Sequence, residues 1–204
     1  MERKACRQKF GLDADGVYLI FTGSFKKWHD LELIVRIMPE LLKANPGIRL
    51  LVVGEGAGRR ILEKLISDSG LEKQVLLLGQ KSFAEIPYYI GAGDICLAPF
   101  GDDQLNKSRG ISPLKLFEYM ACERPVITNP VGGLDVFFQT YKIGVLVSPH
   151  TPLAWKKSIE SLVNDPQRGA EYGRNGRSAV LREFNWETIC KKIEKELQNI
   201  NMTK

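Results

Sequence analysis

The stretch VYLIFTGSFKKWHDLELIVRIMPELLKANPGIRLLVV, residues 17–53, contains two short apolar runs with a helical pattern between them. Residues 17–22 and 49–53 are almost continuously apolar, which is typical of parallel strands that are buried on both faces. Between these runs, apolar residues recur at helical spacing from Leu31 to Leu42. The stretch therefore predicts one strand–helix–strand unit of a parallel sheet.

The same alternation continues along most of the chain. Further strands are predicted at residues 75–78, 95–99, 125–128 and 144–147. Helices are predicted at residues 30–44, 58–69, 84–92, 113–122, 134–141, 151–164, 167–183 and 186–201. The last three helices have side chains typical of helix starts at Thr151, Asp165 and Asn185. We therefore predict an α/β fold, a Rossmann-like doubly wound parallel sheet of about six strands with a C-terminal helical tail.

Composition limits the class of protein. The chain has 204 residues, of which 44% are hydrophobic and 26% charged, as in a globular protein with one sizeable core. Its net charge of +5 suits an anionic partner, although many proteins without one carry such a charge. No apolar run is long enough to span a membrane, and the first residues do not resemble a secretory signal. We expect a cytoplasmic protein that can contact the inner membrane face peripherally.

Few residues are available to bind a metal. The four cysteines form no CxxC pair, and the chain has only two histidines. We therefore expect neither a metal nor a cofactor. Cys96 and Cys122 lie in apolar runs, which predicts buried thiols in a reducing compartment.

The loop after the first predicted strand carries positive charge. Gly23 and Ser24 are followed by Lys26, Lys27 and His29 just before a helix. Helix N-termini favour anions, so this loop is a candidate phosphate site. A solvated turn with surface lysines is the alternative.

Three glycines follow the second predicted strand, in the sequence GEGAG at residues 54–58. Either a phosphate loop or a packing turn fits this pattern. An α/β methyltransferase is a further alternative, but its glycine loop is expected after the first strand.

The helix at residues 113–122 has the most informative start. Ser112 suits the N-cap and Pro113 the first helical position, which leaves the amides of Leu114 and Lys115 free. A cation at this end of a helix is unfavourable by about 0.3–1 kcal/mol, unless an anion binds beside it. Glu118 lies one turn further on, where its carboxylate could accept hydrogen bonds from a ribose. An ordinary amphipathic helix is the alternative.

These segments resemble the donor-binding half of GT-B glycosyltransferases, in particular the retaining group 1 family. The resemblance covers roughly residues 5–195, and SPLKLFEYMA is its most specific part. The matching motifs are GSFKKWH, LLVVGEG, VLLLGQ, GDICLAPF, SPLKLFEYMACERPVI and FNWE. It implies a hexosyltransferase-type enzyme that needs no metal and takes a nucleotide-diphosphate sugar as donor substrate. It implies no nucleic-acid partner.

The resemblance also implies roles for individual residues. Glu118 matches the second acid of the family's E-x7-E signature and would bind the ribose, and Glu118 and Lys115 are the expected catalytic residues. The expected diphosphate-binding residues are Gly23, Ser24, Lys27, His29, Leu114 and Lys115. Gln80 and Lys81 would border the nucleobase, and Gly110, Ile111 and Ser112 would form the loop that faces the sugar.

Two departures from the family pattern stand out. Gly110 lies where the first acid of the signature is expected. Ser24 and His29 lie where the family has an arginine and a lysine, so Lys26, Lys27 and a protonated His29 are the expected substitutes.

The resemblance further implies a missing half. We expect a nucleotide-sugar-binding domain at residues 1–183 and a helix at residues 184–204, with Trp186 at its start, that packs toward an N-terminal acceptor domain or partner chain. Without that domain we expect no activity. A non-catalytic nucleotide-sugar-binding or regulatory module is the alternative, and Gly110 is its best support.

Overall fold

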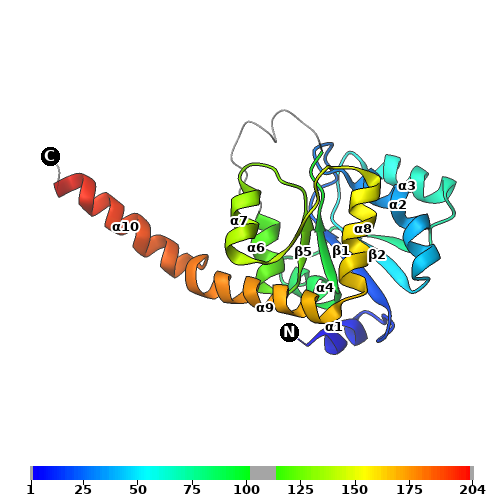
Figure 1. Cartoon of the computed structure of the whole chain (residues 1–204), viewed down its shortest axis with the longest axis horizontal. Coiled ribbons are helices and arrows are strands. Elements are labelled where there is room, and N and C mark those ends of the chain that lie inside the picture. Colours follow the sequence, from blue (N-terminus) through cyan, green and yellow to red (C-terminus); the bar gives the residue numbers. More distant parts are fainter. Residues whose placement is uncertain (1, 102–113, 203–204) are drawn as a thin grey trace.

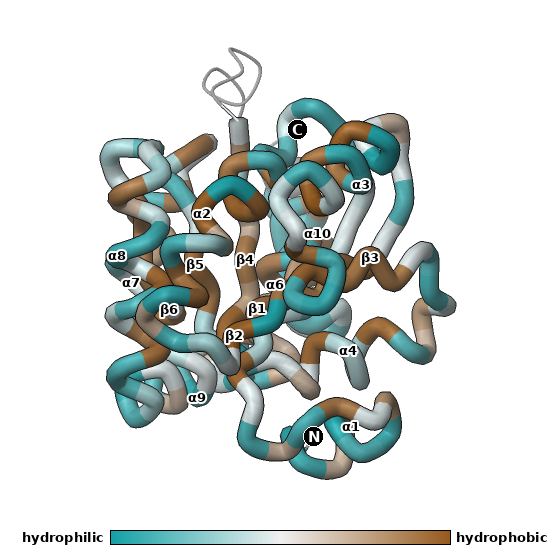
Figure 2. The backbone as a smooth tube through the Cα atoms, turned by 90° about the vertical axis from the view of Figure 1, so that its right-hand side faces the viewer, coloured by the Kyte–Doolittle hydropathy of each residue, from teal (hydrophilic) through white to brown (hydrophobic). Residues whose placement is uncertain are grey.

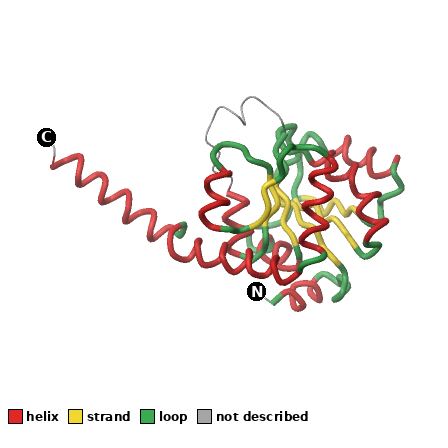
Figure 3. The backbone as a smooth tube through the Cα atoms, in the orientation of Figure 1, coloured by secondary structure: helices red, strands yellow, loops and turns green. Residues whose placement is uncertain are grey.

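A single parallel sheet lies at the centre of the protein (Figures 1 and 3). The computed structural model describes residues 2–101 and 114–202. The strands are β1 (Val17–Thr22), β2 (Ile48–Val53), β3 (Val75–Gly79), β4 (Ile95–Ala98), β5 (Val126–Thr128) and β6 (Gly144–Leu146). Their order is β3-β2-β1-β4-β5-β6, so the direction of strand addition reverses between β1 and β4. The predicted doubly wound sheet is confirmed, and every strand end lies within one residue of its predicted position.

Helices cover both faces of the sheet. One face is covered by α2 (Leu31–Ala44), α3 (Arg59–Asp68) and α8 (Pro152–Val163). The other is covered by α4 (Ile86–Ala92), α6 (Leu114–Ala121), α7 (Leu134–Tyr141) and part of α9 (Pro166–Glu183). The strands supply both cores, because Leu19 and Phe21 face the first set of helices while Tyr18 and Ile20 face the second. Figure 2 shows the resulting hydrophobic centre in brown. Cys96 and Cys122 are buried, as predicted.

The first helix, α1 (Arg3–Lys9), is absent from the sequence prediction. Its sequence RKACRQK has no apolar period, so hydrophobic patterning does not reveal it. Polar contacts fix it instead. Arg7 is buried, donates from Nε to the carbonyl oxygen of Ala92 (3.0 Å) and pairs with the Asp94 carboxylate (2.6 Å). Because Asp94 also accepts from the Tyr18 amide (2.7 Å), α1 is tied to the start of the sheet.

The three C-terminal helices begin with side-chain caps at the predicted residues. Thr151 accepts from the Ala154 amide (3.3 Å) and Asp165 from the Arg168 amide (3.0 Å). Asn185 accepts from the Thr188 amide (2.9 Å) and starts α10 (Trp186–Met202). These caps satisfy amides that have no partner within the helix.

Helix α10 extends away from the rest of the protein (Figure 1). Several large apolar side chains on it are exposed: Trp186 to 81%, Ile193 to 54% and Leu197 to 56%. No helix in the described residues combines the length and the apolar character that a membrane-spanning segment needs.

Candidate functional site

Six of the predicted site residues lie near the ends of β1 and β4, at the point where the strand order reverses. Ligands of open α/β sheets bind in the crevice at such a switch point, outside the carboxyl ends of the strands. Gly23 directly follows β1, and the described part of α6, which follows β4 in the chain, starts at Leu114. Two segments that are distant in sequence therefore meet at this edge.

The glycine turn at residues 54–58 supports this edge by packing. The Gly23 amide donates to the Val53 carbonyl oxygen and the Phe25 amide to that of Glu55, both at 2.9 Å. A Cβ atom on Gly54, where φ is 137°, would overlap with the Gly23 carbonyl oxygen. A Cβ atom on Gly56 would lie 2.7 Å from the Phe25 nitrogen. These glycines let the two loops approach each other closely, so the packing turn accounts for the pattern.

Lys115 extends from the first turn of α6 toward the end of β1. Its Nζ lies 4.2 Å from the centre of the Phe21 ring and 3.0 Å from Nε2 of His29. A Cβ atom on Gly23 would lie 3.0 Å from the same Nζ, so the glycine leaves room for the ammonium. Burial lowers the Lys115 pKa to about 7, and the nearby Glu118 carboxylate only partly offsets this effect.

His29 lies in the loop after β1 and contacts Lys115. Its Nδ1 is 2.7 Å from the Ser24 carbonyl oxygen. Burial, together with the positive charges of Lys115 and Lys26, lowers the His29 pKa to about 4. His29 is therefore neutral at physiological pH, and the prediction of a protonated imidazole is wrong. Neither its burial nor its contact with Lys115 is visible in the sequence.

Helix α6 is held against the sheet by Tyr119. The Tyr119 hydroxyl oxygen accepts from the Thr22 amide (2.9 Å), and the hydroxyl donates to the Leu97 carbonyl oxygen (3.3 Å). The tyrosine is fully buried between the ends of β1 and β4. The preceding residue, Glu118, is half-buried, and this burial raises the pKa of its carboxyl group. Tyr119 thus fixes the helix that carries both Lys115 and Glu118.

These residues surround an open cavity of ≈ 410 Å³. Its lining consists of Thr22, Gly23, Ser24, His29, Ile86, Leu114, Lys115 and Glu118. Most of the predicted diphosphate-binding residues and the predicted ribose-binding acid therefore share one cavity. A lysine ammonium and a carboxylate one turn apart on α6 can bind a phosphate and a diol side by side.

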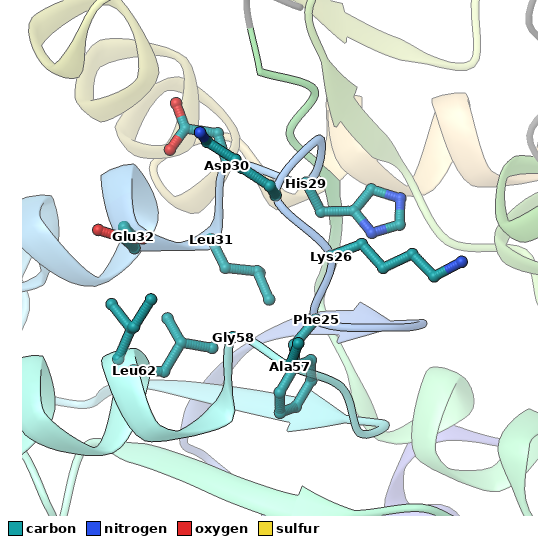
Figure 4. Close-up of a pocket in the computed structure, with 11 residues that line it drawn as sticks. Phe25, Lys26, His29, Asp30, Leu31, Glu32, Ala57, Gly58 and Leu62 are labelled. Carbon is teal, nitrogen blue, oxygen red and sulfur yellow. The ribbon is translucent and has the colours of Figure 1, made fainter.

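A second cavity, of ≈ 270 Å³, lies between the loop after β1 and the starts of α2 and α3 (Figure 4). Leu31 and Leu62 lie on its apolar side, while the side chains of Lys26 and His29 extend away from them (Figure 4). Lys27 lines this second cavity and not the first, so it lies apart from the other predicted diphosphate-binding residues except His29, which lines both cavities.

The remaining predicted residues lie elsewhere. Gln80 is exposed, and the Lys81 ammonium lies 5.7 Å from the centre of the Tyr89 ring. Neither residue lines the ≈ 410 Å³ cavity. Gly110, Ile111 and Ser112 lie outside the described residues.

The sequence did not identify three residues that shape the site. Phe21 and Phe100 place aromatic rings beside the Lys115 ammonium, and Tyr119 fixes α6. Phe21 and Tyr119 lie within apolar runs and look like ordinary core residues. The only available signal is that each occurs close to a predicted ligand-binding loop.

Known proteins match this chain over most of its length. The sequence model of the family described as "Glycosyl transferases group 1" matches residues 2–179. A D-inositol 3-phosphate glycosyltransferase from Segniliparus rotundus is 30% identical over 193 residues, covering 93% of this chain and 41% of the relative. The chain thus spans less than half the length of that relative.

Two solved structures have the same fold. Sucrose-phosphate synthase from Thermosynechococcus elongatus matches with a TM-score of 0.83 at 28% identity, covering 98% of this chain and 49% of that one. Anabaena HepE in complex with UDP-glucose matches with a TM-score of 0.79 at 21% identity, covering 96% and 52%. The fold is therefore half of a GT-B architecture.

The family match also decides between the enzyme classes considered above. The matched residues include the loop after β1 and the first described turn of α6, which line the cavity. They also include the loop after β2, which supports the loop after β1. The methyltransferase alternative is wrong, and the resemblance to GT-B enzymes is confirmed. The chain belongs to the group 1 glycosyltransferases.

Proposed function

We propose that this chain binds a nucleotide-diphosphate sugar and forms the donor half of a retaining glycosyltransferase of the hexosyltransferase type. The observation that carries the proposal is the shared cavity, in which Lys115, Glu118 and the Gly23 loop converge from two distant segments. The family membership supports sugar transfer. The UDP-glucose in HepE supports the class of donor, because that structure has the same fold.

Each group at the site has a role in this proposal. The Lys115 ammonium and the first amides of α6 bind the diphosphate and stabilise the negative charge that develops as it leaves. Glu118 accepts hydrogen bonds from the ribose. The acceptor hydroxyl attacks the sugar from the face that the diphosphate leaves, and the departing diphosphate takes up the hydroxyl's proton. Attack from this face retains the configuration of the sugar. No metal is needed, because the ammonium and the amides supply the positive charge.

The proposal includes an acceptor domain from outside this chain. The chain spans about half of its structural relatives, and α10 presents exposed Trp186, Ile193 and Leu197. We propose that the acceptor domain covers this apolar surface and that sugar transfer requires it. The reaction would take place in the cytoplasm, and a lipid-linked acceptor would bring the protein to the inner membrane face.

Calorimetry with UDP, GDP and ADP tests the donor site. We expect one of these nucleotides to bind, and expect Lys115→Ala and Glu118→Ala each to weaken it about 10- to 150-fold, the equivalent of about 1.5–3 kcal/mol for a charged hydrogen bond. Lys64→Ala and Glu63→Ala, on the exposed surface of α3, are matched controls that should leave the affinity unchanged. Equal affinities for all five proteins would refute the site.

Turnover distinguishes the enzyme from a non-catalytic module. The chain is incubated with nucleotide sugars, with and without a candidate acceptor domain, and sugar transfer and donor hydrolysis are measured. Binding without turnover in every combination would favour the regulatory alternative that Gly110 suggests.

A further inference from the structure

The hydrogen bonds of His29 fix the proton on its ring. Nδ1 lies 2.7 Å from the Ser24 carbonyl oxygen, which can only accept, so Nδ1 carries the hydrogen. In the neutral ring, Nε2 then presents a lone pair, and it lies 3.0 Å from Nζ of Lys115. His29 therefore accepts a hydrogen bond from the lysine. A second proton on the ring would place an N–H donor against the amine.

Among the described residues, the surroundings of this pair contain little negative charge. Phe21 and Phe100 place rings 4.2 and 5.9 Å from Nζ, and both rings also lie within 6 Å of the His29 ring. Lys26 adds positive charge from the loop after β1, and Glu118 adds one carboxylate from α6. Among the described residues, Lys115 and Glu118 are the charged groups that line the cavity, and the Lys115 amine is the one that can pair with an anion.

We infer that His29 is a positioning residue that holds the Lys115 amine in place for the donor's diphosphate, and that the pair takes up a proton when the diphosphate binds. The inference rests on the proposed function. It assigns His29 a role different from direct phosphate binding by a charged imidazole.

Proton uptake follows from how an anion changes this pair. In the free protein the pKa of Lys115 is about 7 and that of His29 about 4. A diphosphate beside Nζ favours the charged form and raises the Lys115 pKa. Binding above the Lys115 pKa of about 7 should then take up protons at this amine, and binding well below it should take up few there.

Nuclear magnetic resonance tests the state of His29 directly. The chain has two histidines, so Nitrogen-15 spectra contain two ring systems, and His29→Gln identifies the signals of His29. We expect a neutral ring with its hydrogen on Nδ1 throughout the neutral pH range. A hydrogen on Nε2, or titration near the usual pKa of 6.5, would overturn the inference.

Calorimetry in buffers with different ionisation enthalpies counts the protons. UDP, GDP and ADP are compared first, and the tightest is used at about pH 6 and about pH 8, on either side of the pKa of Lys115. The terminal phosphate of the nucleotide would release protons when it binds to cations, so its contribution has the opposite sign to the uptake expected at Lys115. We expect uptake at the higher pH that disappears in Lys115→Arg, because arginine stays charged. Binding without uptake, or uptake that persists in Lys115→Arg, would overturn the inference.

Two substitutions of His29 test its positioning role. Leucine removes the acceptor and should weaken nucleotide binding about 10-fold, the cost of a lost charged hydrogen bond. Glutamine can still accept from Nζ and should restore most of the affinity. Equal effects of both substitutions would contradict positioning through this hydrogen bond. Failure of every nucleotide to bind the unaltered chain would refute the proposed function itself, whereas binding with no proton change refutes only this inference.

Discussion

The hydrogen bonds of Tyr119 offer the sharpest test of how the site is built. Phenylalanine at this position keeps the ring and removes only the hydroxyl. The Thr22 amide, which donates to it at 2.9 Å, would then be buried without a partner, because Thr22 is only 3% exposed. An orphaned buried donor costs about 1–3 kcal/mol.

A cost of about 2 kcal/mol corresponds to a fall in melting temperature of about 4–8 °C for a chain of this size. Thermal unfolding followed by circular dichroism measures it. Tyr172→Phe is the matched control, since its hydroxyl accepts from Arg168 in an exposed contact and its loss should change stability by less than about 0.5 kcal/mol.

The same variant should also weaken nucleotide binding, because α6 carries Lys115 and Glu118. If Tyr119→Phe melts at the same temperature as the Tyr172 variant, the Thr22 amide has another partner and the anchoring argument fails. If it melts lower but binds the nucleotide with unchanged affinity, Tyr119 stabilises the fold without positioning the site.

Three further substitutions test the packing and the electrostatics. Gly54→Ala should lower the free energy of unfolding, measured by urea denaturation, more than the control Gly70→Ala does. Both glycines have a positive φ, but only at Gly54 would the new Cβ overlap with a carbonyl oxygen. Gly173→Ala in α9 should also destabilise, since its Cβ would overlap with the Glu123 carbonyl oxygen, and a neutral result would contradict this close packing. Lys115→Met should be more stable than the unaltered chain below pH 7, because the folded unaltered chain buries a charged lysine there. The difference in stability should become smaller as the pH rises from 7 toward 10.5. In this window the lysine is neutral in the folded state but still protonated in the unfolded state, so the unaltered chain gains stability with pH. A constant difference across that range would contradict the buried charge.

The sheet was predictable because its four inner strands, β1, β2, β4 and β5, are almost entirely buried, and the two edge strands are apolar as well. Residues 17–22 and the other apolar runs are typical of buried parallel strands, and each strand was therefore predicted to within one residue. The order of the strands was not predictable, because it depends on which runs pair in space. Helix α1 was missed because the contacts of Arg7, with residues more than 80 positions away, hold it in place.

The candidate site was predictable as a set of loops but not as a set of contacts. The residues of the first loop and of α6 line one cavity, as expected from parallel strands that end at one edge. The contact between His29 and Lys115 spans 86 positions, and burial together with the charge of Lys115 lowers the pKa of His29, so the protonation of His29 was predicted wrongly. The glycine turn was open to two interpretations until the neighbouring loop could be seen against it.

The exposed start of α10 gives the protein an optical reporter of its own. Its three tryptophans lie in three environments: Trp155 is fully buried, Trp28 is 40% exposed beside the candidate site, and Trp186 is 81% exposed. Any protein surface that covers Trp186 would shift its fluorescence emission to shorter wavelength, while Trp155 stays constant as an internal reference. A chain with Trp28→Phe therefore reports the docking of an acceptor domain without an added label, and a chain with Trp186→Phe reports events at the loop after β1.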